Sequence, residues 1–375
     1  MTLERGEKRT TERLVPGVEP LEPASVRTSK VRQRSRRRTG SGDPVIDQKI
    51  REFLDDPAIE VENEDRLQDI LETAFRMART ANRGEMKLVS RSLRELGRAF
   101  RVYAPYRGVR KVSIFGSART KPGDAAYAIT RDFAYAIAAR GWMVITGAGP
   151  GIMAAGHEGA GKKQSFGVGI MLPMEQGANS YIAGDPKLID FKYFFTRKIA
   201  FMKESDAFVL LPGGFGTLDE AFELLTLMQT GKTQIRPIVL LAPPESGYWL
   251  EWLTFVRDHL VARNLASPED LALFEPASSA GDAVRAIARF YRNYDSARYV
   301  GERLVLRMYR VPDDDALAAI NRDFGDLVAR GRIERITVTK EERADEDCVY
   351  CERLAFYPRH NFGRLRQLID RLNDI

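Results

Sequence analysis

The sequence predicts an α/β protein whose central domain is a doubly wound parallel sheet. Two observations lead to this prediction: short strands that are apolar throughout, and helical segments that separate them. Such strands are buried on both faces, and parallel strands need helical crossovers. A third observation is that glycines gather where strands are expected to end, since residues 141–184 hold eleven of the 30 glycines. Folds of this class bind ligands at those strand ends.

Composition excludes several classes of protein. The hydrophobic content of 44% is ordinary for a globular chain, so wholesale disorder is excluded. Two cysteines are too few for a disulfide scaffold. No apolar run approaches the roughly 20 residues of a membrane span, and the N-terminus has no apolar core of a secretory signal. We therefore expect a cytoplasmic protein without a membrane partner.

Residues 1–45 are predicted to be a disordered basic tail, because periodic apolar residues are nearly absent. Residues 1–40 hold eleven basic and five acidic side chains, so the whole net charge of +6 lies there. All seven charges from Arg27 to Arg38 are positive. The favoured interpretation is a solvated tail, and contact with nucleic acid or another acidic partner is the alternative.

Residues 46–108 are predicted to be helical. Apolar residues recur at helical spacing along 67–78 and again along 89–100, with Gly84 between the two stretches and Pro105 after the second. Amphipathic helices of this kind bury their apolar stripe. We expect them to pack against the next domain or another subunit.

The central domain is expected at 109–297 and a small α+β module at 298–375. In the domain, strands are expected at 112–115, 142–146, 166–172, 207–211 and 237–241, with helices at about 124–140, 150–164, 194–204, 217–230 and 247–263. In the module, the order strand, helix, strand, strand, helix is expected at 303–309, 314–329, 332–339, 353–357 and 361–373. We separate the two regions because the first alternates apolar strands with helices, whereas the second has a different order of elements.

The first glycine-rich segment follows the second expected strand and opens a helix. Its glycines are Gly147, Gly149 and Gly151. Free backbone N–H groups at a helix N-terminus suit an anion. The dinucleotide fingerprint G-x-G-x-x-G is not met, because Ile152 stands where the third glycine belongs. An NAD site is therefore disfavoured.

The second glycine-rich segment, residues 212–220, joins the fourth expected strand to a helix. Gly213, Gly214 and Gly216 let consecutive amides face one concavity, and Thr217 adds a hydroxyl, which suits a phosphate. A Walker A loop is excluded, since no Gly-Lys-Thr/Ser follows. Thr217 and Glu220 also fit a capping box, which explains both residues equally well on spacing alone.

These segments resemble the LONELY GUY (LOG) family of cytokinin riboside 5′-monophosphate phosphoribohydrolases, over roughly residues 109–265. Residues 212–220 match its PGGxGTxxE motif, and Arg197-Lys198 matches its Arg-Lys pair. Residues 115–117 resemble its first strand-to-helix loop, and 147–153 its second. Residues 172–176, with Asn179 and Tyr181, look more like longer bacterial members, some of which are general nucleotide 5′-monophosphate nucleosidases.

The resemblance implies a Rossmann-like fold that hydrolyses the N-glycosidic bond of a nucleoside 5′-monophosphate, without cofactor or metal. It implies that Glu220 and Arg197 are catalytic, with Glu220 stabilising an oxocarbenium-like sugar and activating water. It also implies a homo-oligomer, a dimer or larger. The substrate- and phosphate-binding residues that it implies are Gly116, Ser117, Gly147, Gly149, Gly151, Lys198, Gly213, Gly214, Gly216 and Thr217. A wider pocket would include Pro173, Glu175 and Asn179.

Other interpretations stay open at this point. Taken alone, Arg197 fits an exposed helix arginine, and His157 is as well explained by packing as by function. The domain could bind a nucleotide or phosphorylated cofactor without turnover, as the molybdenum-cofactor carrier proteins of similar fold do. Some relatives carry a lysine-decarboxylase label, for which we see no pyridoxal signature.

Cys348 and Cys351 form a lone C-x-x-C, with His360 nearby. Two thiolates supply half of a zinc site, and there is no second cysteine pair to complete it. A redox motif would be expected beside a thioredoxin-like unit, which this module does not resemble. We expect no bound ion here, and a site shared between subunits is the alternative.

Overall fold

The computed structural model describes residues 40–172, 177–344, 348 and 350–375. The chain divides into two compact units, with the division between Met86 and Lys87. The basic tail that we expected at 1–45 lies outside the described residues up to position 39. None of the helices in the described residues is long and apolar enough to cross a membrane.

The first unit contains α1 (Pro44–Leu54) and α2 (Glu64–Thr80). Helix α1 starts inside the predicted tail, because Asp43 caps it by accepting a hydrogen bond from the N–H of Val45 at 2.9 Å. On α2, the predicted apolar stripe is not the buried face. Ile70 is 46% exposed and Phe75 is 43% exposed, so this stripe stays uncovered in the described residues.

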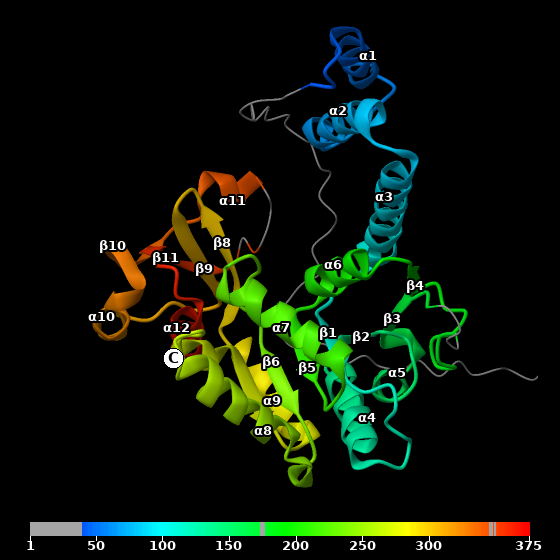
Figure 1. Ribbon diagram of the computed structural model, residues 1–375. Coiled ribbons are helices and arrows are strands. Elements are labelled where there is room, and N and C mark those ends of the chain that lie inside the picture. Colours follow the sequence, from blue (N-terminus) through cyan, green and yellow to red (C-terminus); the bar gives the residue numbers. More distant parts are fainter. Residues whose placement is uncertain (1–39, 173–176, 345–347, 349) are drawn as a thin grey trace, which may run out of the picture. The chain divides into compact units, whose positions relative to one another are not determined.

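The second unit is built on a seven-stranded parallel sheet with the order β4-β3-β2-β1-β5-β6-β7 (Figure 1). Its strands are β1 (Lys111–Phe115), β2 (Met143–Thr146), β3 (Ser165–Ile170), β4 (Leu188–Phe191), β5 (Ala207–Leu210), β6 (Ile238–Leu241) and β7 (Phe274–Ala277). The chain winds outward from β1 to β4, returns to β5 beside β1, and then winds the other way. The predicted doubly wound sheet is confirmed.

Helices cover both faces of this sheet. They are α3 (Arg83–Tyr103), whose last part packs in this unit, α4 (Ala125–Ala138), α5 (Ile152–Ala160), α6 (Phe194–Glu204), α7 (Phe215–Gln229), α8 (Tyr248–Phe255) and α9 (Ala280–Phe290). One buried cluster joins the sheet to α4, α5 and α9. A larger one joins its other face to α3, α6, α7 and α8. The two clusters are the cores of a three-layer fold.

The C-terminal residues form a second, four-stranded antiparallel sheet with the order β10-β11-β9-β8. Its elements are β8 (Tyr294–Val300), β9 (Arg303–Met308), α10 (Asp314–Asp323), β10 (Val328–Ile336), α11 (Lys340–Ala344), β11 (Glu352–Pro358) and α12 (Phe362–Asn373). Strand β8 was not predicted, and it spans the division that we expected at 297/298.

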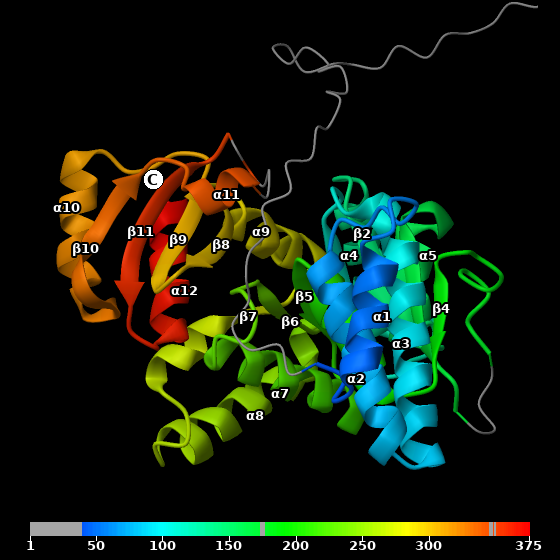
Figure 2. The same ribbon diagram turned by 90° about the horizontal axis from the view of Figure 1, so that it is seen from above.

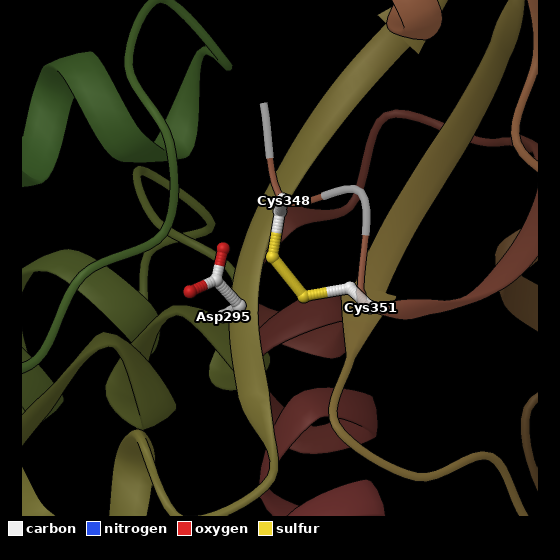
Figure 3. A group of neighbouring side chains, drawn as sticks. All are labelled: Asp295, Cys348 and Cys351. Carbon is white, nitrogen blue, oxygen red and sulfur yellow. A yellow bond between two sulfur atoms is a disulfide. The ribbon is translucent and has the colours of Figure 1, made fainter. Parts of the chain in front are cut away.

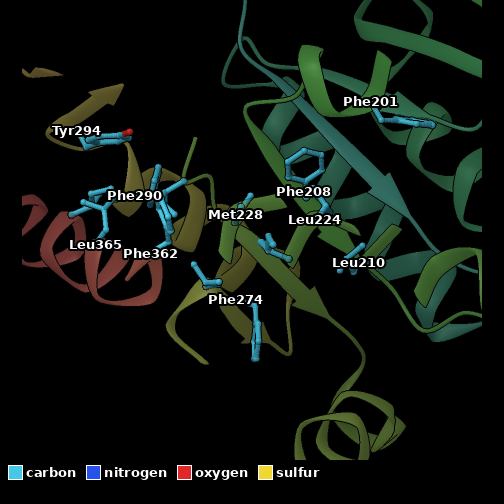
Figure 4. Packing of buried hydrophobic residues seen from close by; sticks show 14 of the residues in the cluster. Phe201, Phe208, Leu210, Leu224, Met228, Phe274, Phe290, Tyr294, Phe362 and Leu365 are labelled. Atoms are coloured by element: carbon cyan, nitrogen blue, oxygen red, sulfur yellow. The ribbon is translucent and has the colours of Figure 1, made fainter. Parts of the chain in front are cut away.

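This four-stranded sheet belongs to the same compact unit as the parallel sheet. Helix α12 packs against α7, α9 and the turn Pro268–Leu273 (Figure 2). The larger core cluster is therefore continuous from Phe208 in the parallel sheet to Leu365 of α12 (Figure 4). The small α+β module shares its core with the α/β domain.

Candidate active site

The candidate site lies where the winding of the parallel sheet reverses, between β1 and β5. Open α/β sheets bind ligands at such a switch point, beyond the carboxyl ends of the strands. Here the three predicted loops meet through their backbones. The N–H of Ser117 donates to the carbonyl of Pro212 at 3.2 Å, and the N–H of Ile152 donates to the carbonyl of Ser117 at 3.1 Å. The loops after β1, β2 and β5 thus form one surface.

Gly151 makes this close meeting of loops possible. Its φ is +67°, in the left-handed region, and a side chain there would collide with the backbone of Ser117 and Ala118. Only glycine tolerates both conditions. The glycine-rich loop after β2 therefore owes its position beside the loop after β1 to the missing side chain at 151.

Arg197 is held firmly on α6 and is half-buried. Its Nε donates to the carbonyl of Val168, the strand residue opposite, at 3.0 Å. Its guanidinium carbon lies 5.3 Å from the ring centre of Phe201. A side chain at position 147 would collide with its guanidinium, so Arg197 lies against the glycine-rich loop after β2. These contacts overturn the interpretation of Arg197 as an exposed helix arginine.

Glu95 of α3 anchors the start of α6, a role that the sequence did not reveal. Its buried carboxylate accepts a hydrogen bond from Thr196 Oγ1 at 2.7 Å and another from the N–H of Lys192 at 2.9 Å. Thr196 directly precedes Arg197 in the helix. Glu95 therefore fixes the turn of α6 that carries Arg197.

Helix α7 begins at Phe215 with Gly214 as its N-cap residue, and no side chain caps it. Thr217 lies in the first turn, where its N–H bonds to the carbonyl of Gly214 at 3.1 Å. The capping-box interpretation of Thr217 and Glu220 is therefore wrong. The box requires Thr217 to be the N-cap residue, but the helix starts two residues earlier.

Glu220 is a buried carboxylic acid, 6% exposed, on the second turn of α7. Its Oε2 is buried without a hydrogen-bond partner among the described residues. Burial raises its pKa to about 7, against the opposing charges of Lys198 and Arg197. Since buried polar atoms are normally satisfied, an orphaned carboxylate oxygen beside two cations indicates a functional group.

Lys198 faces carboxylates of α7. Its Nζ lies 2.8 Å from Asp219 Oδ2 and 2.5 Å from Glu223 Oε2. Burial opposes its charge, but these two partners outweigh burial and raise the pKa of Lys198. Lys198 therefore stays protonated and joins α6 to α7 beside Glu220.

Asn179 and His157 shape the glycine-rich loop after β2. Asn179 Nδ2 donates to the carbonyls of Ala148 and Gly149 at 3.0 and 2.9 Å. His157 is fully buried, and its Nε2 donates to the carbonyl of Phe166 at 3.0 Å. Burial lowers the pKa of His157, so the ring is neutral and its Nδ1 accepts from Asn179 at 3.1 Å. His157 is therefore a buried residue that supports the glycine-rich loop, as the packing interpretation expected.

The loop after β5 has a support that the sequence did not reveal. Tyr248, at the start of α8, donates its hydroxyl to the carbonyl of Gly213 at 2.6 Å. Open space surrounds the positions where side chains would stand at Gly214 and Gly216. This leaves their backbone accessible. The pocket residues Pro173 and Glu175 lie outside the described residues.

Comparison with known proteins bears on the same part of the chain. A family model described as possible lysine decarboxylase matches residues 153–287, which include Arg197 and Glu220. The cytokinin riboside 5′-monophosphate phosphoribohydrolase LOG7 of Arabidopsis thaliana is 34% identical over 99 residues, 26% of this chain and 44% of that protein. This segment is therefore similar in sequence to LOG proteins. It spans less than half the length of the curated LOG proteins that it matches.

Two further LOG-type and fold similarities were found. The probable phosphoribohydrolase LOGL3 of Oryza sativa subsp. japonica is 33% identical over 99 residues, 26% of this chain and 45% of that protein. Among solved structures, the molybdenum cofactor binding protein of Rippkaea orientalis is 20% identical with a TM-score of 0.35, covering 48% of this chain and 94% of that one.

Proposed function

We propose that this chain hydrolyses the N-glycosidic bond of a nucleoside 5′-monophosphate, AMP-like or a cytokinin riboside monophosphate, to free base and ribose 5-phosphate. One observation supports this most strongly. Glu220 is a buried carboxylate with an orphaned oxygen and a pKa raised to about 7, beside Arg197 and Lys198 at the switch point of the sheet. A group that titrates near neutrality suits acid–base catalysis.

In the proposed reaction, the bond between C1′ and the base nitrogen breaks as positive charge builds on the sugar. The ionised Glu220 stabilises that charge and takes a proton from water, whose oxygen bonds to C1′. The proton that water gives up is passed on to the departing base, which restores the ionised Glu220. Arg197 holds the ribose or phosphate, or assists the departing base, with its planar guanidinium. Its position is fixed by the carbonyl of Val168 and by Glu95, which anchors α6.

The 5′-phosphate is proposed to bind at the start of α7. The first turn of a helix presents N–H groups that have no partner within the helix, and the helix dipole favours an anion there. The accessible backbone at Gly214 and Gly216 supports this placement. Gly116, Ser117 and the loop held by Asn179 would line the nucleotide on the side of β1 and β2.

The family model is described as a possible lysine decarboxylase, but the residues of the site fit that activity poorly. A pyridoxal cofactor needs a lysine that becomes a neutral amine to form a Schiff base. Lys198 is the lysine beside the candidate site, and its two carboxylate partners raise its pKa instead. We derive no step through such a cofactor.

We also propose that the chain acts in the cytoplasm as a homo-oligomer. Large apolar side chains are exposed on α6 and α7, next to the site: Phe194, Phe195, Ile199, Phe215 and Phe222. A second copy would cover such a surface. Light scattering measures the mass, and a monomer at micromolar concentration would contradict the proposal.

The test of the function is incubation with AMP, GMP, CMP, UMP and a prenylated AMP, with free base measured by chromatography. We expect base and ribose 5-phosphate in equal amounts from at least one of them. Tight binding without turnover across the panel would replace the proposal by a carrier or sensor function.

A further inference from the structure

A second cluster of reactive side chains lies in the C-terminal module, outside the candidate active site (Figure 3). Cys348 and Cys351 form a disulfide, a pairing that the sequence analysis did not predict. The two sulfurs and a carboxylate oxygen of Asp295 all lie within 4.8 Å of one another. His360, which lies near the cysteines in the sequence, is not part of this group. Asp295 comes from β8, more than 50 residues earlier in the chain.

A buried ionic network holds the backbone of both cysteines. Arg353 Nη2 donates to the carbonyl of Cys348 at 3.1 Å, and Nη1 donates to the carbonyl of Cys351. Its Nε donates to Glu342 of α11 at 3.1 Å, and Glu342 also accepts from Arg307 Nε at 2.8 Å. All three charged side chains are buried, which is costly unless the geometry is good. The two cysteines are therefore held from inside the module.

The carboxylate of Asp295 is oriented as well. Ser296 Oγ donates to its Oδ2 at 2.8 Å, and both Arg110 Nη2 and the Tyr309 hydroxyl lie 3.3 Å from its Oδ1. Metal-binding carboxylates are commonly hydrogen-bonded in this way by outer-shell groups. Two thiolates, one carboxylate and a divalent ion together carry one negative charge, which the neighbouring Arg110 would balance.

The cluster is also reachable. Asp295 and Cys348 line a cavity of about 420 Å³. Its wall also carries four arginines, which favour the thiolate form of the cysteines and would offset the negative charge of the ligands: Arg107, Arg110, Arg236 and Arg307. Cys348 is half-buried, whereas Cys351 is buried. A small ion and a thiol reductant can therefore approach from the side of Cys348, and the cavity has room for a water ligand.

We propose that reduced Cys348 and Cys351, together with Asp295, bind a zinc ion, and that formation of the disulfide abolishes this site. Two thiolates and a carboxylate are ligands that zinc accepts, and a water completes four-coordination. A dithiol can reduce the disulfide: its own two sulfurs join as it gives two electrons and two protons to the cysteine sulfurs. Zinc binding then releases the two thiol protons.

The proposed zinc ion would connect two strands of the C-terminal sheet. Asp295 belongs to β8, and the cysteines precede β11; these two strands flank β9 on either side. A bound zinc ion would link the two neighbours of the central strand. Because the ion binds the folded chain, it stabilises the reduced protein.

The experiment uses the full chain, reduced with a phosphine that is then removed, and titrated with Co²⁺ and Zn²⁺ without oxygen. We expect one metal ion per chain, a thiolate-to-cobalt charge-transfer band, and a higher melting temperature with Zn²⁺. The oxidised chain should bind none, a comparison that needs no variant. Cys348→Ser and Asp295→Asn should each weaken zinc binding by more than about tenfold.

Asp314→Asn serves as the matched control, because this exposed aspartate of the same module pairs with Arg335. It should bind zinc like the unaltered chain. The proposal is overturned if the reduced chain gives no charge-transfer band, or if Asp295→Asn binds as tightly as Asp314→Asn. Half an equivalent of metal per chain would also overturn it, since that points to a site between two copies.

Discussion

The guanidinium of Arg197 occupies the space that a side chain at Gly147 would need. This contact joins α6 to the glycine-rich loop after β2, two segments that are 50 residues apart. With Nε bound to the carbonyl of Val168, the arginine has little freedom to move. The position of Arg197, a central element of the proposed chemistry, thus depends on a glycine that belongs to another loop.

Replacement of Gly147 by alanine should therefore impair the reaction. A methyl group at this position collides with Arg197 and displaces it, and a misplacement of about 1 Å can lower a rate by roughly 10²-fold. The measurement is kcat/KM for base release. Gly97→Ala is the control, because a Cβ there meets open space on helix α3, and this variant should keep full activity. Equal activity of the two variants would contradict the importance of this contact.

The rate should depend on pH near neutrality. The pKa of Glu220 is raised to about 7, and in the proposed reaction it is the ionised form that stabilises the sugar cation and activates water. The rate should consequently rise with pH through about 7 and level off above it. A pH profile of kcat/KM between pH 5 and 9 measures this. A profile that is flat across neutrality would disagree with the assignment.

Removal of the positive charge at Lys198 should move that profile to higher pH. Lys198 lowers the pKa of Glu220, and its loss also leaves the charges of Asp219 and Glu223 unbalanced beside it. Both changes favour the protonated acid. Lys198→Met should therefore shift the midpoint of the pH profile upward. Lys192→Met, which replaces a lysine just before α6, should leave the midpoint in place. A downward shift would contradict this electrostatic account.

The same buried acid should reduce stability at alkaline pH. Folding raises the pKa of this acid. Below about pH 4.5 the acid is protonated in both states and costs no stability, but the free energy of unfolding falls as pH rises through about 7, because the buried carboxyl group must then ionise. A shift of this size corresponds to roughly 3 kcal/mol. Glu220→Gln should therefore be more stable than the unaltered protein at pH 8, and this advantage should shrink towards pH 5. Urea unfolding at both pH values measures the difference.

The buried network of the C-terminal module is a separate stability determinant. Glu342 is fully buried between Arg307 and Arg353. Its replacement by alanine leaves two buried guanidinium groups without their carboxylate, which costs about 3–5 kcal/mol. The neighbouring exposed Glu341→Ala should change stability little. Thermal unfolding of the two variants compares these costs, and similar melting temperatures would show that the network contributes little.

The sequence was informative where local pattern and burial agree. The five inner strands of the parallel sheet were predictable because each is an apolar run bounded by turn residues. The edge strands β4 and β7 were not, because Asp190 and Glu275 interrupt their apolar character at the solvent-facing edge. Strand β8 was missed for a similar reason, since it is largely half-buried and carries polar residues such as Asp295 and Ser296.

The sequence motifs of the candidate site could be predicted, but the residues that hold those motifs in place could not. Gly213, Thr217 and Glu220 lie within one short segment whose spacing has a physical meaning. Glu95 and Tyr248 act on that site from other elements, through hydrogen bonds that only the folded chain creates. The proximity of Asp295 to the cysteines has the same origin. Contacts between distant segments leave no periodicity or spacing in the sequence.

The most direct test of the proposed function is turnover of the nucleotide panel by Glu220→Gln, compared with the unaltered chain and with Glu251→Gln, an exposed glutamate of α8. Glutamine keeps the shape of the side chain but can neither carry the charge nor accept the proton. We expect base release to fall by about 10²–10⁴-fold in Glu220→Gln while nucleotide binding persists, and to be unchanged in Glu251→Gln. Full base release by Glu220→Gln would contradict the catalytic assignment.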